Sequence, residues 1–353
     1  MPKQSNTLPR EPWDTKRVLN LLVNNALLII MLLVVIYIAV SAPVFLSPNS
    51  LINLLSQTAA YLPVALGIAG CIVLTGTDLS AGRAVGITAC VSASLLQTVD
   101  ASNKMWPNLG VLPIPVVLIL AMVLGALIGA FNGFWVAKFK LHPFIVTLAT
   151  QLILYTCLLL YVQMGNNHGS AISSLDQSYT NFVKGSVLSV PLGNGNKAAI
   201  PNYVWYAIIL TILMWFIWNK TTFGKNMFAL GANEEAARVS GVNVFATTVM
   251  VFALAGAMYG YVGFVEGARV ASNTANTGFN YELDAIAACV IGGVSFVGGI
   301  GKIRGIVIGV LMLRLIFVGL PLIHVDQNLQ YAIKGGIILF ACALDMRKYL
   351  VKK

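Results

Sequence analysis

Long apolar runs alternate with short polar breaks along this chain, and the alternation restricts its fold more than any other feature. Most runs approach 20 residues, the length that an α-helix needs to cross the apolar core of a bilayer. Only 10% of the 353 residues are charged and 58% are apolar, whereas a soluble domain has about 25% charged residues. The sequence therefore predicts an all-α, polytopic membrane protein whose backbone polar groups are satisfied inside helices.

Ten apolar runs can be counted, so we expect about ten transmembrane helices in one domain, residues 17–353, after a polar tail over residues 1–16. Residues 164–201 are polar and rich in Gly, Ser and Asn, which indicates a loop outside the bilayer. Gly125, Gly129 and Gly133 recur at a spacing of four, which lets two helix backbones approach closely. The expected spans are residues 21–40, 51–74, about 84–97, 113–137, 144–162, 203–218, 245–265, a run from 283 that glycines interrupt, 303–320 and 329–344.

Basic residues are distributed unequally between the two sides that these spans define. Fifteen lie on the side of both termini and four on the other, while Arg83, Arg314 and Lys334 lie within or near spans, which accounts for all 22. Since cytoplasmic loops carry an excess of Lys and Arg, we expect both termini to be cytoplasmic. The net charge of +10 therefore needs no nucleic-acid partner, because the charges are scattered between apolar runs.

One polar interruption, residues 223–243, is typical of a short helix that lies on the membrane surface. Asn233 suits an N-cap, because its side chain can accept from a free backbone N–H, and two glutamates follow where the helix dipole favours negative charge. Gly241 is placed to end the helix in the left-handed conformation. This segment is too polar to span a bilayer, so we expect it to bind another molecule at the cytoplasmic face. Its candidate contact residues are Gly231, Asn233, Glu234, Glu235, Ala236, Ala237, Arg238 and Gly241.

A second polar segment, residues 75–83, is a candidate for a polar pathway or gate in the membrane. Asp78 is costly to bury unpaired, and Arg83 is close enough in sequence to neutralise it if the segment is irregular. Ser80 lies between them. The alternative, compatible with the first, is an interfacial turn in which Asp78 is the N-cap of the third span.

A third polar segment opens the eighth span. Glu282 and Asp284 suit a helix N-terminus, and with Asn280 and Tyr281 they offer hydrogen-bonding groups that a neutral polyol would need at the outer mouth. Capping combined with docking of a soluble partner is an equally good explanation. Asn53 and Gln57, which share one face of the second span, complete the candidate pathway residues.

Other charged and aromatic residues have simpler explanations. Glu266 and Arg269, three residues apart, are expected to form a local ion pair. Arg314 and Lys334 are expected to extend toward the lipid headgroups. The tryptophans near the ends of the sixth span, Trp205, Trp215 and Trp218, predict an interfacial belt.

The sequence carries no motif for catalysis of its own. Gly301-Lys302 is followed by Ile303 and does not complete a GxxxxGK[ST] phosphate loop. The three histidines are far apart, no serine lies in a GxSxG turn, and no cysteine belongs to a CxxC pair. We therefore expect no catalytic residue, no metal ligand and no cofactor bound by this chain.

Three segments resemble a known family. Glu235-Ala236-Ala237 followed by Gly241 is similar to the EAA–x–x–x–G pattern of bacterial ABC-importer permeases. Residues 219–243, 77–83 and 281–289 resemble the ribose/galactose branch of that family. The pair Gly82-Arg83 resembles the galactose/methyl-galactoside type, where ribose-type relatives commonly have Gly-Ser. The likeness covers nearly the whole chain and is weakest over the first 16 residues and residues 163–199.

This resemblance implies the type II-like importer fold and a homodimer in the bacterial inner membrane. It implies a separate ATP-binding subunit with two nucleotide-binding modules, which would use ATP and Mg²⁺, and a periplasmic sugar-binding protein that would deliver substrate. The helix over residues 233–241 would be the coupling helix, and residues 164–201 would be periplasmic. The substrate expected is galactose or methyl galactoside.

Two alternatives remain open at this point. The permease could carry another monosaccharide, such as ribose or xylose. An ion-coupled secondary sugar transporter is a different class, but it normally needs several acidic residues inside the membrane, and here the acids lie at span ends.

Overall fold

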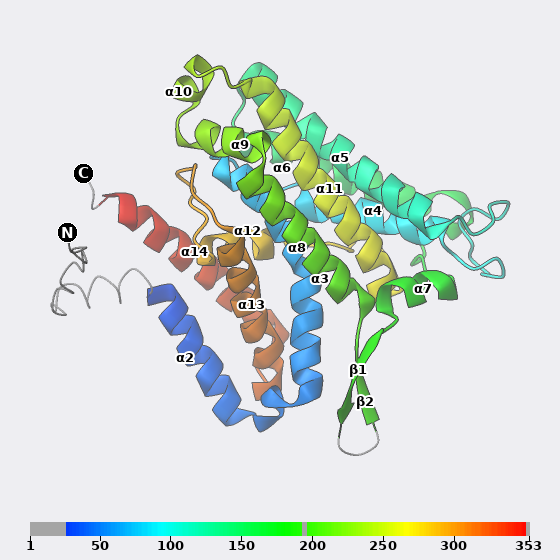
Figure 1. The fold of residues 1–353 in the computed structure, drawn as a ribbon. Coiled ribbons are helices and arrows are strands. Elements are labelled where there is room, and N and C mark those ends of the chain that lie inside the picture. Colours follow the sequence, from blue (N-terminus) through cyan, green and yellow to red (C-terminus); the bar gives the residue numbers. More distant parts are fainter. Residues whose placement is uncertain (1–25, 193–195, 351–353) are drawn as a thin grey trace, which may run out of the picture.

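The computed structural model describes residues 26–192 and 196–350, so the expected tail over residues 1–16 lies outside the described residues. The named elements of this part of the chain are helices, apart from one two-stranded hairpin (Figure 1). The elements are α2 (Ala26–Ser41), η1 (Pro43–Leu46), α3 (Pro48–Val73), α4 (Ala81–Leu95), α5 (Ile114–Phe139), α6 (Pro143–Gln163), η2 (Gly165–Asn167), α7 (Gln177–Lys184), β1 (Leu188–Leu192), β2 (Asn196–Ile200), α8 (Asn202–Lys220), α9 (Thr222–Ala232), α10 (Glu234–Val239), α11 (Val244–Val270), α12 (Tyr281–Ile291), α13 (Ile303–Gly319), η3 (Leu320–Ile323) and α14 (Gln327–Leu350).

Six segments in the described residues are long and apolar enough to cross a membrane: α3, α5, α6, α8, α11 and Ile303–Ile323. The other expected spans coincide with α2, α4, α12 and α14. The 15 residues of α4 and the 11 of α12 rise only about 22 and 16 Å, less than the roughly 30 Å of the apolar bilayer core. The polytopic all-α class is confirmed, and the count of ten spans holds only approximately.

Two helices form the centre of the molecule. Within their most apolar stretches, 83% of α3 and 72% of α11 is buried, against 22% of α5 and 28% of α8. A helix with apolar residues on every side suits either a protein core or lipid, so the sequence alone cannot distinguish the two groups. The structure distinguishes them: α3 and α11 are surrounded by protein, while α5 and α8 are largely exposed on the outside of the molecule.

The glycine run in α5 brings two helix backbones together, as the spacing predicted. A Cβ on Gly129 would lie 1.9 Å from the carbonyl oxygen of Phe252, and one on Gly125 would lie 2.1 Å from that of Gly256. Any side chain at these positions would separate α5 from α11. The two helices are therefore in direct backbone contact along several turns, which is the close approach expected of small residues in a membrane.

The long loop over residues 164–201 has more structure than the sequence predicted. It contains α7, which buries Tyr179 and Val183, and an antiparallel hairpin in which Leu188 pairs with Ile200. The Tyr179 hydroxyl donates a hydrogen bond to the carbonyl of Phe264 on α11. This docked cap and its hairpin lie at one end of the molecule, and α10 lies at the opposite end (Figure 1).

Candidate functional site

Helix α10 forms where the sequence predicted a separately capped helix. Asn233 has an extended backbone, and its side-chain oxygen accepts from the Ala236 N–H at 3.0 Å. At the other end Gly241 has φ +86°, and the Val242 N–H reaches back to the Ala237 carbonyl at 3.0 Å. The predicted caps are confirmed. They fix a six-residue helix that would be unstable alone.

The outward surface of α10 combines exposed charge with one exposed apolar side chain. Arg238 lies 2.6 Å from Glu234, one turn earlier, and 3.6 Å from Glu235. The Glu235 side chain is 77% exposed, and Val239 is 89% exposed. Ala237 is the residue that α10 buries. A short helix with this surface is suited to enter a groove on another protein.

Gly231 connects the base of α10 to the rest of the molecule. It lies in α9, where an added Cβ would be 1.8 Å from the Val73 carbonyl at the end of α3. The same carbonyl accepts from the Gly299 N–H at 2.9 Å. Three segments far apart in sequence therefore meet at Val73: α9, the end of α3 and the loop between α12 and α13. A displacement of α10 would reach all three.

The segment between α3 and α4 is held by hydrogen bonds within the protein. Asp78 is fully buried, and one carboxylate oxygen accepts from the Ser80 N–H at 2.9 Å and the Ser80 hydroxyl at 2.6 Å. Asn132 of α5 donates to the same hydroxyl at 2.9 Å. The Leu79 N–H donates to the Thr147 hydroxyl of α6 at 3.1 Å. These contacts join α4 to α5 and α6.

The expectation that Arg83 neutralises Asp78 is wrong. Helix α4 begins at Ala81, so Arg83 is carried to another face, where it donates to the Ala275 carbonyl at 3.0 Å. Its guanidinium lies 4.3 Å from the centre of the Tyr155 ring. Asp78 is not the N-cap either, because Ser80 occupies that position. Asp78 obtains its hydrogen bonds from Ser80 instead.

The first turns of α4 and α12 lie against each other. A Cβ on Gly82 would be 2.1 Å from a carboxylate oxygen of Glu282 and 2.5 Å from the Gly278 carbonyl. The Gln151 amide of α6 approaches the other Glu282 oxygen at 3.5 Å. Arg83 and Glu282 thus come from the two predicted polar segments and converge beside α6.

Arg314 and Lys334 do not extend to the headgroups, which corrects that expectation. The Lys334 ammonium lies 2.6 Å from one oxygen of Asp284, and Arg314 donates to the other. Asp284 and Arg314 are buried. A buried carboxylate draws cations strongly, because an unpaired charge in the membrane is expensive. Asp284 therefore ties α12 to α13 and α14 and offers no free group at an open mouth.

Two tyrosines extend this ion cluster toward α11. The Arg314 guanidinium lies 3.6 Å from the centre of the Tyr61 ring, and the Tyr61 and Tyr281 rings are 4.4 Å apart. The Tyr281 hydroxyl donates to Glu266 at 2.6 Å. Glu266 in turn pairs with Arg269 at 2.6 Å, which confirms the predicted local ion pair. We call this set the buried ion network: Tyr61, Glu266, Arg269, Tyr281, Asp284, Arg314 and Lys334.

The remaining pathway candidates are not brought into either cluster. Asn53 is exposed and Gln57 half-buried near the start of α3, and Asn53 is about 30 Å along the helix from Val73. Asn280 has φ +62° and makes no side-chain cap for α12. Trp205 and Trp215 are partly exposed as an interfacial belt requires, but Trp218 is buried.

Sequence reasoning did not find Tyr61, Asn132, Thr147, Gln151 and Tyr155 as members of these clusters. They lie in helices that are mostly apolar, three of them in α6. The hydrogen-bond or ring partner of each of these residues is known only once the packing of the helices is known. A polar residue in the middle of an apolar span was the available signal.

Comparison with known proteins agrees with the polytopic membrane fold. Residues 50–342 match the family described as "Branched-chain amino acid transport system / permease component". The galactose/methyl galactoside import permease protein MglC of Escherichia coli is 45% identical over 96% of this chain and 99% of its own length. The protein of the same name from Haemophilus influenzae is 42% identical over 95% of this chain and 97% of its own length. The ribose import permease protein RbsC of E. coli is 34% identical over 91% of this chain and 93% of its own length. No solved structure matches.

The match extends from α3 to α14 and includes both the exposed helix and the buried ion network. The relatives are import permeases, membrane components of ABC importers that leave ATP hydrolysis to another subunit. This agrees with a membrane chain in which no motif for ATP hydrolysis was found in the sequence. The chain therefore belongs to the family of permease components of the branched-chain amino acid transport system type.

Proposed function

We propose that this chain imports galactose or methyl galactoside, with energy supplied by a separate ATPase through α10. The observation that carries the coupling role is a capped, solvent-exposed helix on a membrane protein, with Glu235 and Val239 directed away from its own core. The sugar is supported by the relatives named galactose/methyl galactoside import permease, which match almost the whole chain.

The proposed assembly contains two copies of this chain in the bacterial inner membrane, with both termini cytoplasmic. An ATP-binding subunit with two nucleotide-binding modules receives the two α10 helices and uses ATP and Mg²⁺. A periplasmic sugar-binding protein docks at the end that carries α7 and the hairpin. The separation of α10 from the hairpin supports this arrangement, because it leaves one face for each partner (Figure 1).

Transport proceeds in this proposal by alternating access. Closure of the ATPase displaces α10, and Gly231 transmits the displacement to Val73 at the end of α3. Helix α3 carries Tyr61, whose ring lies against Arg314 in the buried ion network. The network joins α12, α13 and α14, so motion of α3 would also reach these three helices.

The proposed sugar-facing surface is where the starts of α4 and α12 meet α6. Arg83 and Glu282 supply charged hydrogen-bonding groups there, and Gln151 supplies an amide. The Tyr155 and Phe279 rings lie 4.3 and 5.2 Å from the Arg83 guanidinium and offer apolar faces. The polar groups of the other candidates bond within the protein, so we assign them a supporting role and no direct contact with sugar. These residues are Asp78, Ser80, Tyr281 and Asp284.

Uptake in a strain whose own sugar permease is replaced by this chain tests the proposal. Radiolabelled galactose is expected to accumulate, and ribose and xylose are expected to accumulate much less. Ribose is the specific competitor, because the ribose import permease RbsC is 34% identical. Preferential ribose uptake would overturn the sugar assignment. Galactose uptake that persists without the ATPase subunit would overturn the coupling role and favour a secondary transporter.

A further inference from the structure

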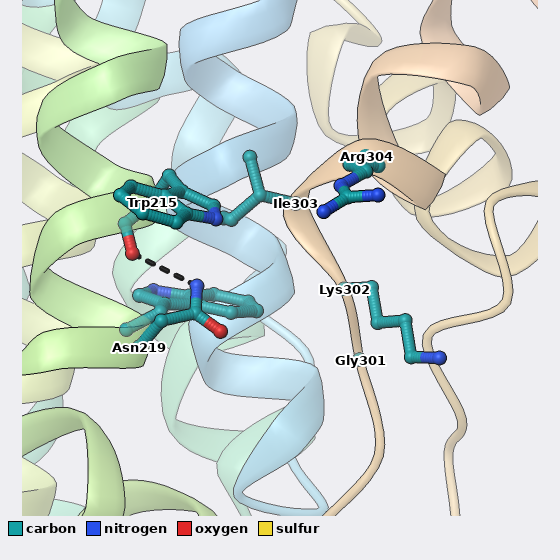
Figure 2. Close-up of a pocket in the computed structure, with 7 residues that line it drawn as sticks. Trp215, Asn219, Gly301, Lys302, Ile303 and Arg304 are labelled. Atoms are coloured by element: carbon teal, nitrogen blue, oxygen red, sulfur yellow. Dashed lines mark hydrogen bonds between the residues drawn. The ribbon is translucent and has the colours of Figure 1, made fainter.

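A pocket separate from the buried ion network opens between the end of α8 and the start of α13. It encloses about 290 Å³. Figure 2 shows Trp215 and Asn219 on one side and Lys302 and Arg304 on the other. The Asn219 amide donates to the Trp215 carbonyl at 2.8 Å, which fixes the α8 wall. The lining residues are Trp215, Trp218, Asn219, Gly301, Lys302, Ile303 and Arg304.

An apolar groove continues from this pocket along the same two helices. It encloses about 390 Å³ and shares Trp215, Ile303 and Arg304 with the pocket. Its other lining residues lie one turn further from the helix ends, toward the middle of the membrane: Thr211, Ile212, Val307 and Ile308. Ile212 is 60% exposed and Ile308 is 48% exposed, so the groove is open on the outer surface of the molecule.

The pocket is positively charged and has no acidic residue to balance it. Lys302 and Arg304 are exposed, and neither forms an ion pair with any carboxylate among the described residues. A third cation, Lys220, lies 5.9 Å from the centre of the Trp215 ring. No Asp or Glu lines the pocket or the groove. The charges are grouped at the end of the molecule that carries α10, since α8 leads directly into α9 and α10.

We propose that this pocket and groove bind one anionic phospholipid. The phosphate of its headgroup lies between Lys302 and Arg304, and one acyl chain follows the groove past Ile212 and Ile308. Basic pockets between transmembrane helices on the cytoplasmic side are suited to anionic headgroups. Indole rings prefer the depth at which headgroup and acyl chain join, and Trp215 lines both compartments.

The bound lipid would add a contact between α8 and the start of α13, which line the pocket from its two sides. Helix α8 precedes the α9–α10 segment, and α13 carries Arg314 of the buried ion network. A phospholipid between them holds the end of α8 against the start of α13. The lipid would therefore stabilise the position of α8, which leads into α9 and α10. This effect does not depend on which sugar is transported.

Native mass spectrometry of the purified full-length chain with phosphatidylglycerol tests the site, with phosphatidylcholine as the neutral lipid. The wild type is expected to retain phosphatidylglycerol after phosphatidylcholine has been stripped. Removal of both charges, Lys302→Gln with Arg304→Gln, is expected to weaken phosphatidylglycerol binding by about tenfold or more. The matched control is Lys138→Gln with Lys140→Gln, which removes two exposed cations at the same spacing near the end of α5. The control is expected to bind like the wild type.

Three results would overturn the proposal. Equal binding by the Lys302/Arg304 variant and the control would show that the pocket is not the site. Displacement of the lipid by glycerol 1-phosphate at equal concentration would show that the groove holds no acyl chain. Oxidative cross-linking of Ile212→Cys between two chains, in a background with the exposed Cys157 changed to Ser, would show that a second copy covers this face.

Discussion

Helix α10 and the buried ion network perform opposite structural tasks in the same chain. Helix α10 is six residues long, exposed, and held by capping hydrogen bonds within the ten residues from Asn233 to Val242. The buried ion network draws seven residues from α3, α11, α12, α13 and α14 and shields most of them from solvent. A change in α10 can alter binding while the fold remains, whereas a change in the network alters the fold itself.

The difference follows from how each region obtains its stability. Exposed ion pairs such as Glu234–Arg238 contribute about 0–1 kcal/mol, since water screens them. Removing one member of a buried pair leaves an uncompensated charge and costs about 3–5 kcal/mol. The two regions therefore predict a descending series of effects on the free energy of unfolding, and the order of that series can be measured.

The largest loss of stability is expected from Asp284→Ala. The substitution leaves Arg314 and Lys334 without their carboxylate, and we expect a loss of about 3–5 kcal/mol. The loss of stability is measured by heating the detergent-purified chain and recording the folded fraction that remains by size-exclusion chromatography. The control replaces all three charges, Asp284→Leu with Arg314→Met and Lys334→Met, and should unfold near the wild-type temperature while uptake is lost. Equal destabilisation of both variants would mean that the charges are not the cause.

A smaller loss is expected from Gly231→Ala. The new Cβ would lie 1.8 Å from the Val73 carbonyl, so α9 must move away from α3 at a cost of about 1–3 kcal/mol. Sugar uptake should fall more than stability if, as proposed, the contact between α9 and α3 transmits the displacement of α10. Gly335→Ala in α14 is the control, since its added Cβ meets nothing within 4 Å beyond its chain neighbours and its own helix backbone. Normal uptake by Gly231→Ala would remove this contact from the coupling route.

Asn233→Ala is expected to cost about 1 kcal/mol through loss of the α10 N-cap. Hydrogen exchange at the Ala236 amide should accelerate, while exchange in α11 stays the same. The Asn243 side chain caps α11 in the same way, by accepting from the Ala246 N–H at 2.9 Å. Asn243→Ala should therefore accelerate exchange at Ala246 and leave exchange at Ala236 unchanged. Unchanged exchange at Ala236 in the Asn233→Ala variant would show that packing alone holds α10.

The smallest effect on stability, within about 0.5 kcal/mol, is expected from Glu235→Lys. Its side chain is 77% exposed, yet ATP-dependent uptake into proteoliposomes should be lost, because the reversed charge would face the ATPase in the proposed assembly. Asp100→Lys makes the same charge change in an exposed loop and should transport normally. Wild-type uptake by Glu235→Lys would refute α10 as the coupling helix.

The sequence predicted α10 in detail because every contact that defines it is local. Asn233 bonds three residues ahead, and Val242 bonds five residues back, so both caps follow from residue type and spacing. The Glu266–Arg269 pair could be predicted for the same reason.

The buried ion network could not be predicted, because its contacts join distant residues. Asp284 lies 30 residues before Arg314, and nothing in the spacing shows that α12, α13 and α14 meet there. Without the partner, extension to the headgroups was the cheaper arrangement for Arg314 and Lys334. The prediction for Arg83 was wrong for the opposite reason. Arg83 is near Asp78 in sequence, but α4 begins at Ala81 and directs the Arg83 side chain to the Ala275 carbonyl instead.

The contact of α5 with α11 determines which parts of the protein can bend. Since a Cβ on Gly129 or Gly256 would overlap the opposite backbone, the two helices have no side-chain layer to deform at these turns, and we expect them to move as one stiff lever. Asn243 caps α11 at the end that follows α10, so in the proposed mechanism a displacement of α10 would act on this lever at its capped end. We therefore expect the bending that a transport cycle needs to occur outside this pair of helices.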